Sequence, residues 1–337
     1  MKNQLLIART FVFCSFLVST SGVLISEDLG TPNAPSVEFN SSHLDSAFSS
    51  TSSPSATPST SSSASSSASM LEMLPMEVHN IPGSYRPADS EDEELIAHLV
   101  PLEGEAPLMA PIRWAKAGAR HIQAEIRDYS CRIVKRERIN GVLGREETIF
   151  AKVRHEPFSV YMKFEAPRRF RGREVIYVEG KNDGLLAVHG VGLEALAGTL
   201  NISPTGRQAM KNNLHPITEF GILNLARRLA QTGEENLHRA SYSVTYAECK
   251  LNGQECVCVE VLNSDPHEDA LFHKAHVFVD VKRNFPVKYV AWGWPNSAGE
   301  LPVLEEYTYV DIQTNQNFSD FDFCTTNPEY NYRESRR

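Results

Sequence analysis

The segment Tyr242–Leu262, YSVTYAECKLNGQECVCVEVL, decides the fold because it holds two runs of alternating apolar residues on either side of Asn252-Gly253. Asn-Gly between two such runs is the strongest short-range signal for a β-hairpin with a two-residue loop. That loop fixes which residues face each other, and the facing residues are aromatic or β-branched pairs of the kind that stabilise a sheet. The predicted pairs are Val244 with Val261, Tyr246 with Val259, and Cys249 with Cys256.

The facing cysteines raise the question of a disulfide. Directly opposed residues lie about 5 Å apart at Cα, which is within disulfide reach. In an oxidising compartment, Cys249 and Cys256 would either form a disulfide or remain as buried free thiols. Cys258 lies on the same strand as Cys256, and the segment has no CxxC pair and no nearby paired histidines. We therefore predict no metal site and no cofactor.

Strand-like runs continue on both sides of the hairpin, separated by short turns. In Phe158–Glu165 the apolar residues Met162 and Phe164 alternate with polar ones, as expected for a half-buried strand. The other predicted strands are Cys131–Arg138, Glu146–Arg154, Val175–Glu179, Leu185–His189, Val277–Val281, Val287–Trp292 and Glu305–Ile312.

Helical patterns occur in two places. From Pro111 onward an apolar stripe with a period of 3.6 residues runs to Ile126, which predicts one amphipathic helix. A helical insert is expected over residues 193–231, with a short helix at Leu193–Leu200 and a longer one capped by Thr218. Arg227 and Arg228 are expected near the C-terminal end of the longer helix.

This order of elements predicts an α+β domain with a single antiparallel sheet of about ten strands. Parallel crossovers would need a helix between successive strands, and these are missing. A twisted sheet of this size tends to curl, so we expect an incomplete barrel whose concave face is covered by helices.

The N-terminal third has a different character. Lys2 and Arg9 precede an apolar stretch, so residues 1–25 are expected to be a signal peptide or an uncleaved N-terminal anchor. Residues 49–69 contain 13 Ser and 3 Thr, and we expect residues 26–106 to form an acidic, disordered linker. The folded domain is predicted over residues 107–332, and residues 333–337 are expected to be disordered.

The charge distribution limits the function. Residues 1–106 hold 13 acidic and 3 basic residues, whereas residues 107–337 hold 29 acidic and 30 basic residues. Without a basic excess, a mainly nucleic-acid-binding protein is excluded. No clean apolar run of about 18 residues follows residue 30, which excludes a polytopic membrane protein. What remains is an exported soluble domain behind a long N-terminal tail.

Several longer motifs carry a family resemblance. They are Lys152–Phe164 (KVRHEPFSVYMKF), Gly172–Gly190 (GREVIYVEGKNDGLLAVHG), Leu214–Leu225 (LHPITEFGILNL) and Asn327–Tyr332 (NPEYNY). These segments resemble a bacterial exported family, domain of unknown function 1571. The resemblance implies export to the periplasm or cell envelope of a bacterium. More distantly, Val277–Val290 and Tyr307–Phe323 resemble LolA/LolB-like lipoprotein carriers. That wider resemblance implies a curved, incomplete barrel closed by helices, with an apolar cavity that holds acyl chains.

On this basis, the expected function is non-catalytic binding of a lipid or of a lipoprotein acyl chain in the concave face. Enzymatic residues are not predicted, because neither His155 nor His189 has a nucleophile that the sequence places beside it. A hydrolase is the least favoured interpretation. The residues predicted to contact an apolar ligand are Met162, Phe164, Tyr242, Val244, Tyr246, Trp292 and Trp294.

A second hypothesis is an interaction or sensing module for an envelope protein. The loop after Pro167 contains Arg168, Arg169, Arg171 and Arg173 around Phe170. This basic loop would suit an anionic membrane surface, an acidic glycan or the acidic tail of the protein itself, or would be a solvated loop without a partner. A peripheral or N-terminally tethered membrane contact is compatible with either hypothesis.

Overall fold

The computed structural model describes residues 79–80, 97–266 and 270–332. The predicted signal peptide or anchor, the Ser-rich tract and the last five residues lie outside the described residues. None of the helices within the described ranges is long and apolar enough to cross a membrane.

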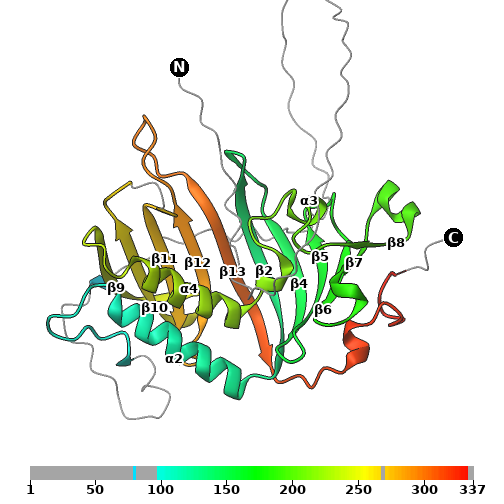
Figure 1. Ribbon diagram of the computed structural model, residues 1–337, viewed down its shortest axis with the longest axis horizontal. Helices are drawn as coiled ribbons and strands as arrows, with labels where there is room; N and C mark the ends of the chain where they lie inside the picture. Colours follow the sequence, from blue (N-terminus) through cyan, green and yellow to red (C-terminus); the bar gives the residue numbers. More distant parts are fainter. Residues whose placement is uncertain (1–78, 81–96, 267–269, 333–337) are drawn as a thin grey trace, which may run out of the picture. The chain divides into compact units, whose positions relative to one another are not determined.

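All described strands belong to one antiparallel sheet (Figure 1). Its strands pair in the order β1-β9-β10-β11-β12-β13-β2-β4-β5-β6-β7-β8, and β3 pairs with β2. The strands are β1 (His79–Asn80), β2 (Asp128–Ile139), β3 (Val142–Leu143), β4 (Glu147–Arg154), β5 (Ser159–Ala166), β6 (Glu174–Val178), β7 (Leu186–His189), β8 (Thr199–Ile202), β9 (Tyr242–Leu251), β10 (Gln254–Asn263), β11 (Lys274–Asp280), β12 (Pro286–Trp292) and β13 (Val303–Thr314).

The hairpin register predicted from Asn252-Gly253 is confirmed, since β9 and β10 pair with Val244 opposite Val261, Tyr246 opposite Val259, and Cys249 opposite Cys256. Asn252 and Gly253 both have positive φ, as a tight two-residue hairpin loop requires. Of the two alternatives considered for the facing cysteines, the structure shows the second: both are buried free thiols.

The predicted fold class, an antiparallel α+β domain with an unclosed sheet, is confirmed. The sheet is larger than the expected ten strands. One strand that was not predicted is β8, because the sequence placed its first residues at the end of a short helix over Leu193–Leu200. That prediction is wrong at this end. The helical turn η2 (Gly192–Ala197) stops before Gly198, and Leu200 and Ile202 then alternate as strand residues. A four-residue strand offers too few alternations to be recognised beside a longer helical pattern.

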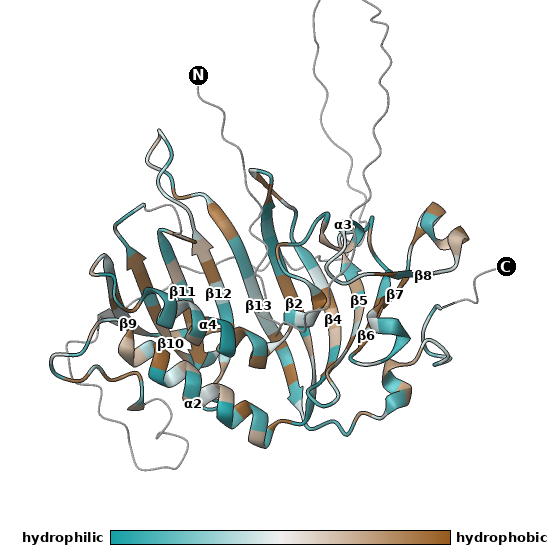
Figure 2. Cartoon of the chain, viewed as in Figure 1, coloured by the Kyte–Doolittle hydropathy of each residue, from teal (hydrophilic) through white to brown (hydrophobic). Residues whose placement is uncertain are grey.

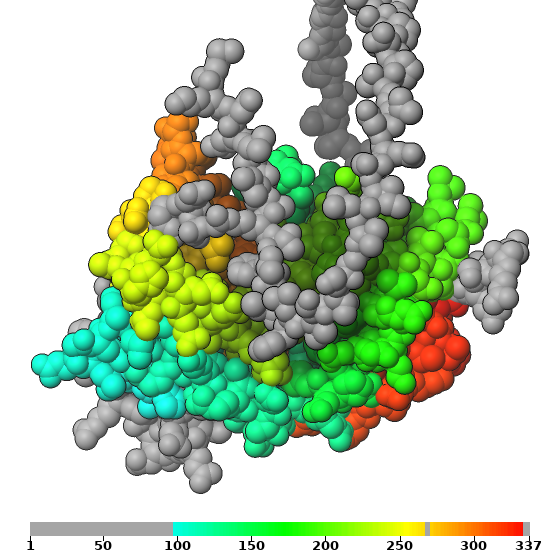
Figure 3. Space-filling view, viewed as in Figure 1, coloured from blue at the N-terminus to red at the C-terminus, as the bar shows by residue number. Residues whose placement is uncertain are grey.

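Two helices cover one face of the sheet, here called the cavity face. They are α2 (Met109–Glu125) and α4 (Ile222–Asn236), which pack against each other in front of β10–β13 (Figures 1 and 3). Their contact is close at Gly233, where an added Cβ would lie 2.5 Å from Cγ1 of Ile112. A third, one-turn helix, α3 (Arg207–Met210), lies in the connection from β8 to α4.

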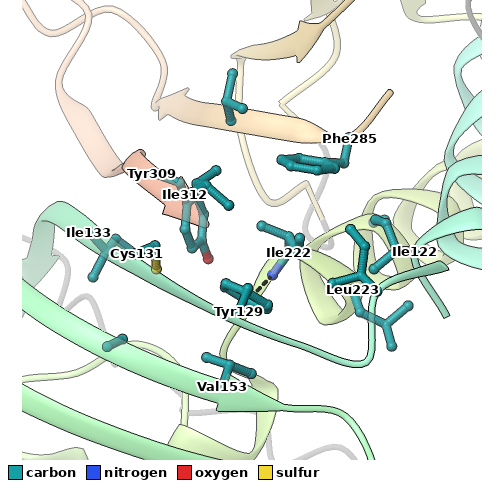
Figure 4. Packing of buried hydrophobic residues seen from close by; sticks show 14 of the residues in the cluster. Ile122, Tyr129, Cys131, Ile133, Val153, Ile222, Leu223, Phe285, Tyr309 and Ile312 are labelled. Atoms are coloured by element: carbon teal, nitrogen blue, oxygen red, sulfur yellow. Dashed lines mark hydrogen bonds between the residues drawn. The ribbon is translucent and has the colours of Figure 1, made fainter. Parts of the chain in front are cut away.

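The start of α4 rests on two tyrosines of the sheet. The backbone N–H of Ile222 donates to the buried hydroxyl of Tyr129 on β2, 3.0 Å away (Figure 4), and the backbone of Gly221 hydrogen-bonds Tyr309 on β13. These contacts occupy amides in the first turn that a helix cannot satisfy by itself. Gly221 has φ +109°, and a Cβ there would lie 2.6 Å from the Tyr129 hydroxyl.

Two details predicted for α4 are therefore wrong. Thr218 does not cap the helix but lies in the 3₁₀ turn η3 (Ile217–Glu219). Arg227 and Arg228 lie in the middle of the helix, because it continues to Asn236. The insert as a whole is also less helical than expected, since η2, β8, α3 and η3 precede α4.

The opposite face of the sheet, here called the outer face, is covered in part by the C-terminal segment after β13 (Figure 1, red). The ring of Tyr330 stacks on Tyr161 of β5 at 4.0 Å between centroids. Glu174, fully buried on β6, accepts hydrogen bonds from the backbone N–H and the side-chain amide of Asn331. The NPEYNY motif thus fastens the chain end to the outer face.

The packed region begins upstream of residue 107. Leu99 is buried in the same apolar cluster as Leu108 and Trp114, and Arg113 forms a salt bridge with Glu105 at 2.8 Å. Leu99 and Glu105, which lie in the segment expected to be linker, therefore contact the start of α2.

Replacement of Tyr129 by Phe tests the importance of the α4 contact. The variant leaves the Ile222 amide buried without an acceptor, so we expect the free energy of unfolding to fall by about 1–3 kcal/mol. Urea denaturation followed by circular dichroism measures this change. Tyr177→Phe, at a half-buried tyrosine of β6, is the matched control and should change stability by less than about 0.5 kcal/mol. Equal stability of the two variants would contradict the capping role.

Candidate functional site

A cavity of about 780 Å³ lies between the cavity face of the sheet and the segments that cover it. Side chains from β5–β8 at one end of the sheet and from β10 and β11 at the other line this same cavity, so the sheet must curve around it. The opposite wall is formed by α2, α4 and the connection between β8 and α4. Alternation along the strands directs one set of side chains inward, and Figure 2 shows the corresponding alternation of hydropathy.

Two apolar regions form the ends of the cavity. One lies between β10–β11 and the helix α2, and the other lies on β5–β8. The first is lined by Ile112, Trp114, Val259, Val261, Phe272, Ala275 and Val277, and the second by Met162, Phe164, Val175, Leu186, Val188, Leu200 and Ile202.

A group of polar side chains separates these apolar ends and is called here the polar belt. Its members come from the central strands β2 and β13 and from the segments that cover them. They are Lys135, Glu137, Glu305 and Tyr307 from the sheet, and Asn213, His215 and Arg228 from the opposite wall.

The polar belt connects the two walls of the cavity directly. Nε2 of His215 lies 2.7 Å from a carboxylate oxygen of Glu305, and Nζ of Lys135 donates to the side-chain oxygen of Asn213 at 2.6 Å. The backbone N–H of Leu214 donates to Glu137 at 3.3 Å. Residues 213–215 are therefore attached to the floor of the cavity by three polar contacts.

The remaining belt contacts stabilise the two buried carboxylates. The hydroxyl of Tyr307 donates to Glu137 at 2.6 Å and also lies 3.1 Å from Glu305. Arg228 contacts the imidazole of His215. A guanidinium can only donate, so Nδ1 of His215 accepts the hydrogen bond from Arg228. Nε2 then carries the proton and donates it to the carboxylate of Glu305.

These contacts change the acidity of the belt. Burial acts to raise the pKa of Glu305, but the hydrogen bond from His215 and the charge of Arg228 outweigh it, so the pKa lies below its ordinary value. Burial raises the pKa of the nearby Glu147, a change that Lys135 opposes. The pKa of the Tyr307 hydroxyl is raised well above its ordinary value by burial and by the two glutamates.

The predicted ligand contacts are divided by the structure. Met162, Phe164 and Tyr242 line the cavity, whereas Val244, Tyr246, Trp292 and Trp294 are not among its lining residues. Val244 and Tyr246 pack against the apolar cluster beneath α2. Trp292 packs against His276 and Lys274, and Trp294 packs against His273. The tryptophans alternate on one strand and its extension, and this pattern alone cannot show which sheet face they occupy.

The basic loop lies at the edge of the cavity. Arg173 lines the cavity and donates to Glu194 at 2.7 Å, while Arg169 stacks over the ring of Phe170. Arg171 donates to the backbone carbonyl of Glu165, and Arg168 is exposed. The sequence identified this loop by its charge but could not show that it borders the cavity.

The polar belt was missed from sequence because its members are scattered between residues 135 and 307. The local signals are two pairs spaced two residues apart, Lys135 with Glu137 and Glu305 with Tyr307, and this spacing is common in any half-exposed strand. Their burial depends on the covering segment. The belt therefore forms only where the fold brings β2, β13 and the insert together.

The other reactive groups are placed as follows. Nδ1 of His155 hydrogen-bonds the carbonyl of Ile126, and His189 packs against the ring of Tyr332. Burial raises the pKa of Cys256 and of Cys258 to about 12. Within residues 97–266 and 270–332, no group of three or more His, Cys, Asp or Glu side chains is arranged to hold a metal ion.

Comparison with solved structures identifies several similar folds at low sequence identity. Lipoprotein LppX of Mycobacterium tuberculosis is 9% identical, with a TM-score of 0.35, over 62% of this chain and 97% of that chain. A LolA superfamily protein from Nitrosomonas europaea is 11% identical, with a TM-score of 0.27, over 62% and 96%. A putative outer membrane lipoprotein-sorting protein domain from Vibrio parahaemolyticus is 13% identical, with a TM-score of 0.31, over 62% and 97%.

No curated protein matches the sequence. The model of one protein family does match, over residues 126–332, and its description is "Protein of unknown function (DUF1571)". The matched region runs from the end of α2 to the NPEYNY motif and includes every strand from β2 to β13. Since this match extends over more than half of the sequence, the chain belongs to the DUF1571 family.

Proposed function

We propose that the protein is a non-catalytic carrier that holds a long acyl chain, from a lipid or from a lipoprotein, in its cavity. The observation that carries this proposal is the cavity of about 780 Å³ with its two apolar ends. Its volume lies within the range of about 300–1,000 Å³ that is typical of small-molecule sites. The N-terminal sequence pattern supports export, so we place the carrier in the bacterial envelope.

The driving force must come from the apolar ends. The belt groups hydrogen-bond to one another and leave little to offer a ligand. Each buried CH₂ group contributes about 0.8 kcal/mol, so ten of them contribute about 8 kcal/mol. Association itself costs at least about 4 kcal/mol. Micromolar binding needs about 8 kcal/mol in total, which favours chains of roughly fifteen carbons or more over short ones.

Entry of such a chain requires one wall to move. The segment at residues 203–221 covers the middle of the sheet and is attached there through the polar belt. Its release would open the cavity without disturbing the β-ladder. We therefore propose that this segment is the gate.

Filling one apolar end tests the carrier function. Val175, half-buried on β6, lines the cavity, and Val175→Trp should reduce binding of palmitate at least about tenfold by occupying the space of the chain. Isothermal titration calorimetry on delipidated protein measures the affinity. Val134→Trp is the control, because Val134 is a half-buried valine of β2 that does not line the cavity. The carrier proposal fails if wild-type protein binds no palmitate, or if both variants bind it equally.

The pH dependence of Glu305 tests the gate. Because its folded-state pKa is lowered, its stabilisation is present above the ordinary pKa and is lost as the pH falls through the lowered value. As the pH falls from about 5 through the lowered pKa of Glu305, hydrogen exchange at residues 212–220 should accelerate relative to β4, after correction for intrinsic rates.

Glu305→Gln should show this faster exchange already at about pH 6 and should respond less to acid. Glu306→Gln is the matched control, since Glu306 pairs with Lys288 at 2.9 Å and does not line the cavity. Uniform acceleration over the whole domain, or the same exchange in both variants, would show that the belt does not hold the gate.

A further inference from the structure

The most exposed leucines of the described domain lie together at one edge of the sheet. Leu193 and Leu196 on the turn η2 are 86% and 81% exposed. Residues three apart in a 3₁₀ helix lie on the same side, so the two side chains form one apolar tip. The turn projects from the sheet next to β8 (Figures 1 and 3) and is mostly apolar in colour (Figure 2).

The basic loop lies beside this tip. Arg173 forms a salt bridge with Glu194 at 2.7 Å, and a Cβ on Gly172 would lie 3.8 Å from the side chain of Val191. The loop and the turn therefore form one continuous surface, here called the rim, made of residues 167–173 and 190–198.

The charge of the rim is strongly positive. It contains four arginines and one carboxylate, Glu194, which Arg173 already pairs. Among the residues that the structure describes, no carboxylate is within salt-bridge distance of Arg168, Arg169 or Arg171. Phe170 adds an aromatic ring, whose centroid lies 4.3 Å from the guanidinium carbon of Arg169 and 4.6 Å from that of Arg173.

We infer that the rim docks onto an anionic lipid bilayer. Exposed leucines beside an aromatic ring and unpaired arginines are the combination that binds membrane interfaces, with apolar groups entering the acyl boundary and cations meeting anionic headgroups. An acidic protein surface would satisfy the arginines but not the projecting leucines, whereas a bilayer satisfies both.

The rim is also part of the cavity edge. Phe170, Arg173 and Glu194, all within the rim, line the cavity. A docked rim would therefore place the mouth of the cavity against the membrane, and an acyl chain could pass between the two with little exposure to water. This transfer role rests on the proposed carrier function, whereas docking itself does not.

Vesicle flotation of the full chain tests the docking. Wild-type protein should bind vesicles of phosphatidylcholine with one third phosphatidylglycerol more tightly than vesicles of phosphatidylcholine alone, and high salt should weaken this preference. Leu193→Ser/Leu196→Ser should reduce the partition coefficient at least about tenfold. Arg168→Gln/Arg169→Gln/Arg171→Gln should abolish the preference for anionic vesicles.

Leu102→Ser/Val142→Ser is the matched control, because both residues are exposed apolar side chains outside the rim. Its partition should equal that of wild type. The inference is overturned if the rim variants and this control bind vesicles equally.

A local probe separates docking of the rim from any contact made by the N-terminal residues. In Leu196→Trp, emission should shift to the blue and be quenched by lipids brominated on the acyl chain, in excess of the signal from the wild-type tryptophans. An unchanged spectrum would overturn the inference. Palmitate binding in solution should be unaffected by Leu193→Ser/Leu196→Ser, so loss of docking and loss of carrier function are distinguished.

Discussion

The hydrogen bonds from the first turn of α4 to Tyr129 and Tyr309 are the contacts on which the architecture depends. They fix a helix that has no side-chain cap of its own to two neighbouring strands near the middle of the sheet. Since α4 packs against α2, this attachment positions both covering helices. A cavity of about 780 Å³ is left between the concave face of the sheet and these covering segments.

The cavity contains buried carboxylates, and the hydrogen bonds of the polar belt offset the free energy needed to bury them. Burying carboxylates beside an apolar cavity is unfavourable unless each finds partners, and Glu137 and Glu305 find them in Tyr307, Lys135 and His215. The partners on the opposite wall are supplied by the connection from β8 to α4. The belt thus joins buried charged groups of the sheet to the segment that covers them, while apolar side chains predominate on either side of it.

The two faces and one edge of the sheet carry different kinds of side chain and make different contacts. The outer face is occupied by the C-terminal segment, which buries Glu174 and stacks Tyr330 on Tyr161. The cavity face provides apolar volume. The edge at β8 carries the exposed leucines of η2 and the adjoining arginines. The contacts that stabilise the domain, the proposed binding cavity and the proposed membrane-docking rim therefore depend on different side chains, so each can be altered separately by mutation.

Local patterns in the sequence determined the hairpin at Asn252-Gly253, the alternating strands, the α2 stripe and the antiparallel α+β class, because these depend on neighbours within about ten residues. The family motifs added the expectation of a curved carrier-like fold. The tertiary structure alone decided which alternating side chains enter the cavity, and it placed Met162 there but not Trp292. It also decided how α4 is capped, since Tyr129, ninety-three residues before Ile222, takes the place predicted for Thr218. Finally, it decided the polar belt, because the members of the belt meet only when distant strands and the covering segment enclose one cavity.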